Sequence, residues 1–168
     1  MVFNRMAKVV VLWAALLPWC AQSEDMMSTG TARIIDGDTI EISGEVHRLH
    51  GIDAPERKQA CRTQTSAPWP CGARATDALR DHIAGRDVTC IARTKGHYGR
   101  WISVCYVPAQ GLGQDLNAWM VRQGWALAYR RYSRDYVFDE DTAKTQKRGL
   151  WTGTFLPPWL WRRKAGTK

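Results

Sequence analysis

Three acidic and two basic side chains within the first 100 residues are spaced as a phosphate-hydrolysing site requires. Asp38 follows an Asp-Gly turn, Asp53 and Glu56 flank an Ala-Pro pair, and Arg48 and Arg100 lie in two separate segments. Hydrolysis of a phosphodiester needs a cation that neutralises the phosphate, a base for the water, and positive groups that stabilise the developing charge. Calcium prefers carboxylate oxygens, and guanidinium groups bind two phosphate oxygens at once. The set therefore predicts a metal-dependent phosphodiesterase site.

The elements that must position these side chains can be read from turn residues and apolar spacing. Three short runs of β-type composition, 31–35, 39–43 and 46–49, are separated by turn sequences. Periodicity further predicts helices at 73–83, 115–123 and 133–147 and strands at 88–92 and 101–107, with Ser133 capping the last helix and Gly149 ending it. This order predicts an α+β, mainly β fold, an OB-type five-stranded barrel with three α-helices. Strand pairing would bring the acids and Arg48 together at one end of the barrel.

The two ends of the chain differ from this central part. Residues 1–23 combine an early basic region, an apolar run at 9–17 and a small-x-small site, which predicts a secretory signal peptide. The run is shorter than the ~20 apolar residues that span a bilayer, although a retained N-terminal anchor is the alternative. Residues 24–30 are expected to be disordered, 31–152 to form the single domain, and 153–168 to be a Trp-rich basic tail. We expect an exported, periplasmic or secreted monomer with no membrane segment after processing.

The excess of basic over acidic residues indicates which kind of molecule the chain binds. The full chain carries 24 Lys and Arg against 16 Asp and Glu, a net charge of +8. Removal of residues 1–23 takes away two basic residues and no acid, which leaves 22 − 16 = +6. A positive surplus favours a polyanionic partner such as nucleic acid. The basic end formed by Arg162, Arg163 and Lys164 is expected to be solvated, with a non-specific phosphate contact as the alternative. His47 and His50 are expected to be surface or packing residues.

Four cysteines remain outside the predicted signal peptide, and an even number in an exported chain predicts two disulfides. Three pairings are possible. Cys90 and Cys105 flank a predicted hairpin turn and can face each other across it, which leaves Cys61 and Cys71 to close a short loop. A zinc site is the disfavoured alternative, because no Cys-x-x-Cys pair is present.

Three motifs in order resemble the staphylococcal nuclease (thermonuclease) family. They are Asp-Gly-Asp-Thr, then Arg-Leu-x-Gly-Ile-Asp-Ala-Pro-Glu, then Tyr-Gly-Arg, and the resemblance extends over residues 31–151. It implies a calcium site made by Asp38, Asp53 and the Ala54 carbonyl, Glu56 as the general base, and Arg48 and Arg100 as phosphate-binding arginines. It also implies calcium-dependent cleavage of DNA and RNA with little sequence preference, leaving 3′-phosphate ends.

Four further residues are weaker candidates for substrate binding. Tyr129 and Tyr132 lie near the family's nucleotide-stacking tyrosines, with the local alignment shifted by one residue. His97 stands where the family has a lysine, and Tyr98 could either stack on a base or pack on the turn. Two rival functions remain: a non-catalytic OB-fold protein that binds nucleic acid or another anionic polymer, and an envelope protein serving polysaccharide metabolism. Carboxylates crowded near a phosphate argue against a pure binder.

Overall fold

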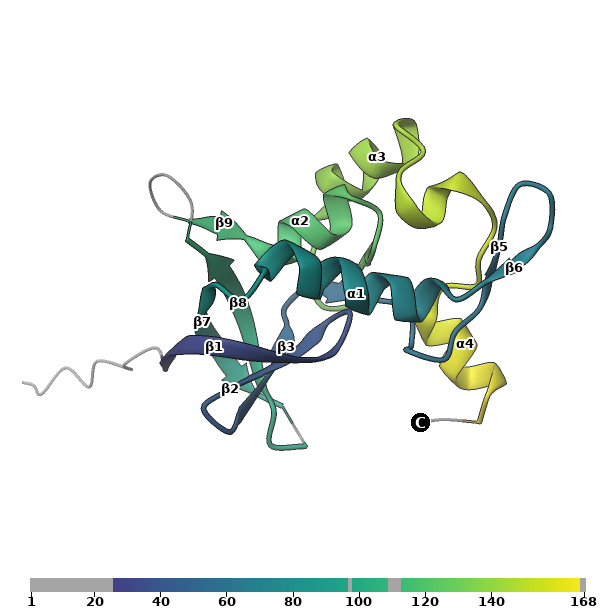
Figure 1. Cartoon of the computed structure of the whole chain (residues 1–168). Helices are drawn as coiled ribbons and strands as arrows, with labels where there is room; N and C mark the ends of the chain where they lie inside the picture. The colour runs from purple at the N-terminus through teal and green to yellow at the C-terminus, as the bar shows by residue number, and fades with distance from the viewer. Residues whose placement is uncertain (1–25, 97, 109–112, 167–168) are drawn as a thin grey trace, which may run out of the picture.

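The computed structural model describes residues 26–96, 98–108 and 113–166, and its centre is a closed barrel of five strands (Figure 1). The strands are β1 (Met27–Asp36), β2 (Thr39–Ile42), β3 (Glu45–Leu49), β7 (Asp87–Lys95) and β8 (Trp101–Val107). Their order is β3-β2-β1-β7-β8, all antiparallel, and a parallel pairing of β3 with β8 closes the ring. The predicted OB-type five-stranded barrel is therefore confirmed. The short strand β9 (Gln114–Asp115) pairs antiparallel with the end of β8.

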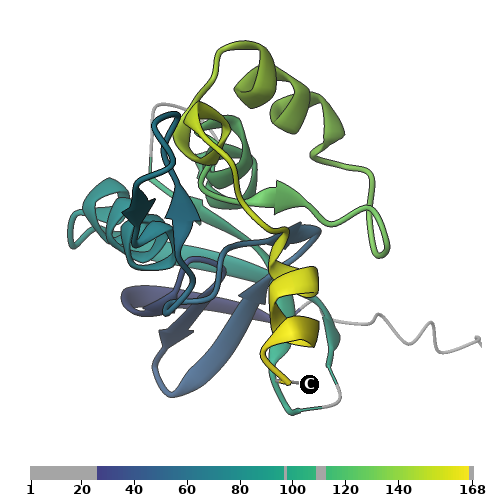
Figure 2. The same cartoon turned by 90° about the vertical axis from the view of Figure 1, so that its right-hand side faces the viewer.

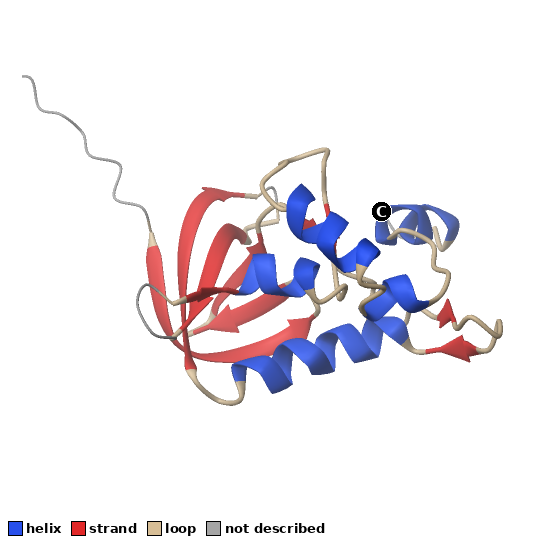
Figure 3. Ribbon diagram, turned by 90° about the horizontal axis from the view of Figure 1, so that it is seen from above, coloured by secondary structure: helices blue, strands red, loops and turns tan. Residues whose placement is uncertain are grey.

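Two helices, α1 (Cys71–Ile83) and α2 (Leu116–Arg122), pack on the barrel, and a third, α3 (Val137–Thr145), packs on α2. Helix α1 buries Ala75, Leu79 and Ile83, whose spacing gives one apolar face. Helix α2 is capped by the Asp115 side chain, which accepts a hydrogen bond from the Ala118 N–H. In Figure 3 the barrel strands lie together on the left, and the helices run along and beyond them.

Short strands and the C-terminal segment build the region beside the barrel opening. Strand β4 (Ile52–Asp53) pairs with β10 (Leu127–Ala128), and β5 (Cys61–Arg62) pairs with β6 (Pro68–Trp69). The 3-10 helix η1 (Gly149–Thr152) leads through a bridge between Arg62 and Thr154 into helix α4 (Pro158–Lys164). Figure 2 shows α4, in yellow, on the side facing the viewer. Within the described residues no helix is long and apolar enough to cross a membrane.

Both predicted disulfides are confirmed. Cys90 and Cys105 are directly opposite partners in the β7–β8 ladder, so the bond joins two strands across the hairpin. Cys61 and Cys71 join β5 to the first residue of α1. The second bond fixes the start of α1 against the loop that follows β4, and this loop carries Glu56.

Three predictions about secondary structure differ from the structure. Residues 24–30 were expected to be disordered, but β1 begins at Met27, because the backbone of 27–31 pairs with β7. Helix α3 begins at Val137 rather than at Ser133, because the Ser133 hydroxyl accepts a hydrogen bond from the Asp135 N–H in a separate turn. The tail contains a fourth α-helix, α4, with proline at its first position, where a missing N–H costs nothing. The predicted signal peptide, residues 1–23, and His97 lie outside the described residues.

Candidate active site

The turn between β1 and β2 brings Asp38 to the end of strand β3. Asp38 is buried, and its backbone N–H donates to the Asp36 carboxylate at 3.1 Å. The next residue, Thr39, pairs with Arg48 in the β2–β3 ladder, and the Leu49 N–H donates to the Asp38 carbonyl at 2.8 Å. The strand register therefore sets Asp38 and Arg48 side by side before any side-chain contact is considered.

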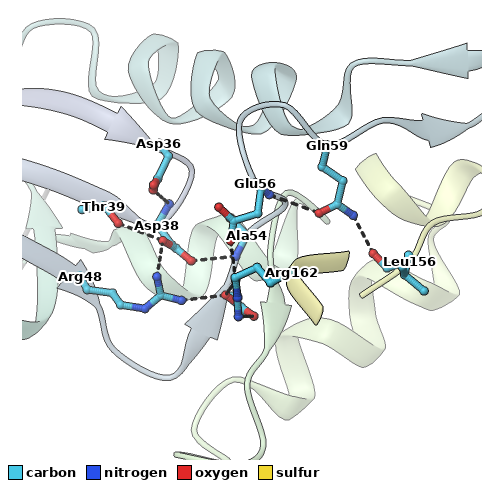
Figure 4. Close-up of polar contacts among 10 residues, drawn as sticks. Asp36, Asp38, Thr39, Arg48, Ala54, Glu56, Gln59, Leu156 and Arg162 are labelled. Carbon is cyan, nitrogen blue, oxygen red and sulfur yellow. Dashed lines mark hydrogen bonds and ion pairs between the residues drawn. The ribbon is translucent and has the colours of Figure 1, made fainter. Parts of the chain in front are cut away.

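Strand β4 supplies the second carboxylate, and one guanidinium joins the two. Arg48 Nη1 donates to Asp38 Oδ1 at 3.0 Å, and Arg48 Nη2 donates to Asp53 Oδ1 at 2.7 Å. The Ala54 N–H donates to Asp38 Oδ2 at 2.9 Å, which ties the two acidic segments together through the main chain (Figure 4). Asp38, Arg48, Asp53 and Ala54 thus meet at one place, as their spacing predicted.

Glu56 projects from a tight loop that is braced by the start of α1. The Gln59 N–H donates to the Glu56 carbonyl at 2.6 Å, and the Glu56 N–H donates to Gln59 Oε1 at 3.3 Å. A Cβ on Gly72 would lie 1.7 Å from the Glu56 carbonyl oxygen, so only glycine allows α1 to approach this closely. The position of the Glu56 carboxylate therefore depends on the contact between this loop and α1.

A third arginine, which the sequence analysis did not include, completes the cluster. Arg162 of α4 donates from Nη1 to Asp53 Oδ1 at 3.0 Å and from Nη2 to Asp53 Oδ2 at 2.7 Å. Its Nη1 also donates to Glu56 Oε1 at 2.6 Å. The expectation that the basic end is solvated is therefore wrong for Arg162, although Arg163 and Lys164 are exposed. The aromatic and proline residues just before Arg162 are the only sequence signal that this end could pack.

Burial and mutual repulsion shape the electrostatics of the acids. Burial raises the pKa of Asp53, while its hydrogen bonds from Arg162 oppose that rise and the charge of Asp38 adds to it. Burial and the charge of Asp38 raise the pKa of Asp36 to about 7. The charge of Asp38 also raises the pKa of Arg48, which keeps that guanidinium protonated. The carboxylates therefore lie in a place that favours added positive charge.

The donor set suits a hard cation that shares its coordination with solvent and substrate. Asp38 and Asp53 offer only oxygen atoms, which calcium and magnesium prefer. In the described part of the chain no group of three or more His, Cys, Asp and Glu side chains could hold a metal alone. A cation bound here would therefore need main-chain carbonyl, water or phosphate oxygens as well, and the Ala54 carbonyl is adjacent in sequence. Such incomplete protein coordination leaves positions for a substrate phosphate.

Arg100 and Tyr98 lie at the β7–β8 turn and do not join the cluster of acids. Arg100 immediately precedes β8, two residues before Ile102, which pairs with Arg48 across the parallel β3–β8 ladder. It forms no ion pair with any described residue, whereas Arg48 forms two. Tyr98 is 84% exposed. Arg100 thus lies near Arg48 along the barrel, because β8 is the strand next to β3. The Arg100 guanidinium, unlike that of Arg48, forms no ion pair with the acids among the described residues.

The two predicted stacking tyrosines lie beside α4. Tyr129 stacks on Trp159 with ring centroids 5.3 Å apart, and Tyr132 meets Tyr129 edge-on at 4.9 Å. An open pocket of about 570 Å³ lies between residues 128–131 and the side chains of Trp159, Arg162 and Arg163. Arg162 also contacts Asp53, so it is shared by this aromatic and basic pocket and the acidic cluster.

His47 is a buried histidine next to the site, and it predicts an acid sensitivity of the fold. Its Nδ1 lies 2.9 Å from the Ser103 hydroxyl, its Nε2 has no partner among the described residues, and burial lowers its pKa from 6.5. Because the pKa of His47 is lower in the folded than in the unfolded chain, protonation favours unfolding. The contribution of His47 to the unfolding free energy is therefore complete above pH 6.5 and is lost as the pH falls below that value. We expect His47→Gln to lose less unfolding free energy than the wild type between pH 7.5 and pH 5.

Urea unfolding curves at pH 7.5 and pH 5 measure the unfolding free energy of each protein and hence its loss on acidification. His50→Gln is the matched control, because His50 directly follows the same strand, β3, but is only partly buried. It should keep the acid sensitivity of the wild type. An equal loss of unfolding free energy in His47→Gln and in the wild type would show that His47 does not contribute to it.

Comparison with known proteins agrees with this geometry. The family model described as staphylococcal nuclease homologue matches residues 47–153, which include the end of β3, the Glu56 loop and the β7–β8 hairpin. An uncharacterized endonuclease of Escherichia coli O157:H7 is 34% identical over 166 residues, covering 95% of this chain and 99% of that protein. A micrococcal nuclease of Shigella flexneri is 32% identical over 175 residues, covering 95% and 91%, and a succinoglycan biosynthesis protein of Rhizobium meliloti is 35% identical over 124 residues, covering 73% and 63%. With the five-stranded barrel and a match over more than half its length, the chain belongs to the staphylococcal nuclease family.

Proposed function

We propose that the chain is an endonuclease that hydrolyses phosphodiester bonds of DNA and RNA in a calcium-dependent reaction. We further propose little sequence preference and products with 3′-phosphate ends. The observation that carries the proposal is one cluster in which Arg48 joins Asp38 to Asp53 and Arg162 joins Asp53 to Glu56. Family membership and the endonuclease and micrococcal nuclease names of two relatives support it.

Each side chain has a role that follows from its place. Asp38, Asp53 and the Ala54 carbonyl would hold Ca²⁺, which supplies positive charge to the phosphate when it is bound. The Glu56 carboxylate, whose side chain is 33% exposed, can accept a proton from a water molecule. Arg48 is held by two acids at the strand end and directs its remaining N–H groups to phosphate oxygens. Arg100 on the neighbouring strand would approach the same phosphate.

The remaining predicted substrate contacts are made by residues outside the acidic cluster. Tyr129, Tyr132 and Tyr98 would contact the nucleotides next to the scissile bond, and His97 would contact a phosphate. Aromatic rings and cations bind nucleic acid with little regard to base, because every base has a flat face and every nucleotide a phosphate. This fits a nuclease of low sequence preference.

The rival functions are weaker for a physical reason. A pure nucleic-acid binder gains nothing from three carboxylates beside a phosphate site, since they repel the ligand. The name of the Rhizobium meliloti relative keeps a role in polysaccharide metabolism as the second candidate. Two disulfides further support our proposal that the protein acts outside the cytoplasm, in the periplasm or the medium, and we propose that it is a monomer.

Cleavage assays on the purified chain test the proposal directly. Plasmid DNA and single-stranded RNA are incubated with calcium, with magnesium or manganese, and with a chelator, and the ends are mapped by phosphatase sensitivity. We expect degradation of both substrates with calcium and a loss of at least about 100-fold in rate with chelator, because the phosphate charge is then uncompensated. Intact nucleic acid together with cleaved succinoglycan-type polysaccharide would favour the second candidate.

A further inference from the structure

The C-terminal helix α4 contacts two acids of the site directly through Arg162. Arg162 forms three hydrogen bonds, two to Asp53 and one to Glu56, at 2.6–3.0 Å. The Asp53 side chain has no exposed surface, and that of Arg162 is 23% exposed. Figure 4 shows Arg162 next to Glu56 and on the opposite side of the cluster from Arg48. The guanidinium thus lies between the acid that would hold the cation and the acid that would activate water.

This contact is built into the fold, because the segment before α4 is anchored at several points. The Gln59 side chain donates to the Leu156 carbonyl at 2.7 Å, so the residue that braces the Glu56 loop also holds the tail. Arg62 and Thr154 exchange two backbone hydrogen bonds of 2.9 Å. Trp159, one helical turn before Arg162, stacks on Tyr129. These contacts orient the face of α4 that carries Trp159 and Arg162 toward the site.

We propose that Arg162 is a third arginine of the active site, a positioning residue that holds the carboxylates of Asp53 and Glu56 for the reaction. Its Nη1 bridges Asp53 Oδ1 and Glu56 Oε1, which fixes the distance between the two acids. Among the described residues Glu56 Oε2 accepts no hydrogen bond, so this oxygen remains for the water. Helix α4 is on this account part of the catalytic domain rather than an appended tail. The inference rests on the proposed function of the same site.

A consequence for cation binding follows from the same contacts. Arg162 donates to both oxygens of Asp53, so a cation must share or displace at least one of these bonds. A positive charge beside the site also repels a divalent cation. Arg162 therefore weakens calcium binding while it supports turnover, and these two effects have opposite signs. A residue that only stabilised the fold would support both.

The test compares Arg162→Gln with the wild type in two separate measurements. Calorimetric titration of the substrate-free protein with calcium should give a dissociation constant lowered on the order of fivefold, because one repelling charge is gone. Plasmid cleavage at saturating calcium should show kcat lowered on the order of 10-fold to 100-fold, because Glu56 is no longer held in place. The effect on KM should be smaller. Arg162→Lys should recover part of kcat, since an ammonium group keeps the positive charge but lacks the planar fork that donates to both oxygens of Asp53.

Lys164→Gln is the matched control, because it removes the same charge from an exposed position in the same helix. It should keep the calcium affinity and kcat of the wild type, and circular dichroism melts should show that all variants are folded. If calcium affinity and kcat are both unchanged in Arg162→Gln, Arg162 has no role in cation binding or turnover. If calcium affinity and kcat both rise, Arg162 inhibits the enzyme by blocking the site. If calcium affinity, kcat and the melting temperature all fall, Arg162 only stabilises the fold. Each of these three results overturns the inference, whereas an inactive wild type would instead refute the proposed function.

Discussion

Glu56→Gln should lower kcat by roughly 10²-fold to 10⁴-fold and leave the binding of calcium and nucleic acid within a few-fold of the wild type. The amide keeps the size of the carboxylate and an oxygen that can accept the hydrogen bond from Arg162, so the geometry of the cluster survives. It cannot accept the proton of the attacking water. Single-turnover cleavage of a labelled oligonucleotide at saturating calcium measures the chemical step apart from product release.

The matched control for this change is Glu41→Gln. Glu41 pairs with Arg33 on the outside of the barrel, and a surface ion pair contributes only ~0–1 kcal/mol. This variant should cleave at the rate of the wild type. A Glu56→Gln protein with full calcium-dependent activity would show that another group serves as the base, and the cation site assigned to Asp38 and Asp53 would be unaffected by that result.

The barrel could be predicted from the sequence because its strands carry their own signals. Strand β8 was predicted at its observed bounds, Trp101–Val107, since an apolar run follows a Gly-containing turn. The start of β1 could not be predicted, because residues 27–30 are mostly small or polar and become a strand only by pairing with β7, about 60 residues away. Ser133 was a good N-cap by type, but a local turn uses its hydroxyl, and α3 begins later.

The residues of the candidate site likewise divide into those that could be predicted from the sequence and one that could not. Asp38, Arg48 and Asp53 could be predicted because they lie close together in sequence: the β2–β3 register sets Asp38 beside Arg48, and Asp53 on β4 follows Arg48 by five residues. Arg162 could not, because it meets Asp53 and Glu56 from 109 and 106 residues away, and one arginine in a basic end has no local signature. Its placement depends on tertiary contacts such as the stacking of Trp159 on Tyr129.

Asp53→Asn should lower calcium affinity by roughly 100-fold or more and abolish cleavage at calcium concentrations that saturate the wild type. Calcium affinity depends strongly on the number of charged oxygen ligands, and Asp53 supplies one of the two carboxylates of the proposed site. Asparagine fills the same buried space but offers one neutral oxygen in place of two charged ones. Plasmid cleavage across a calcium titration measures the loss of activity, and recovery at very high calcium would indicate that binding rather than chemistry was damaged.

Thermodynamic linkage gives this prediction a second readout that does not depend on catalysis. Calcium at 100 times the dissociation constant should raise the unfolding free energy of the wild type by about 2.7 kcal/mol, because only the folded state holds the site together. If the dissociation constant rises 100-fold in Asp53→Asn, the same calcium concentration should add only about 0.4 kcal/mol. Asp77→Asn removes a half-exposed acid of α1 and should keep the full gain. An undiminished gain in Asp53→Asn would place the cation elsewhere, because a ligand that stabilises the fold equally with and without this carboxylate does not bind to it.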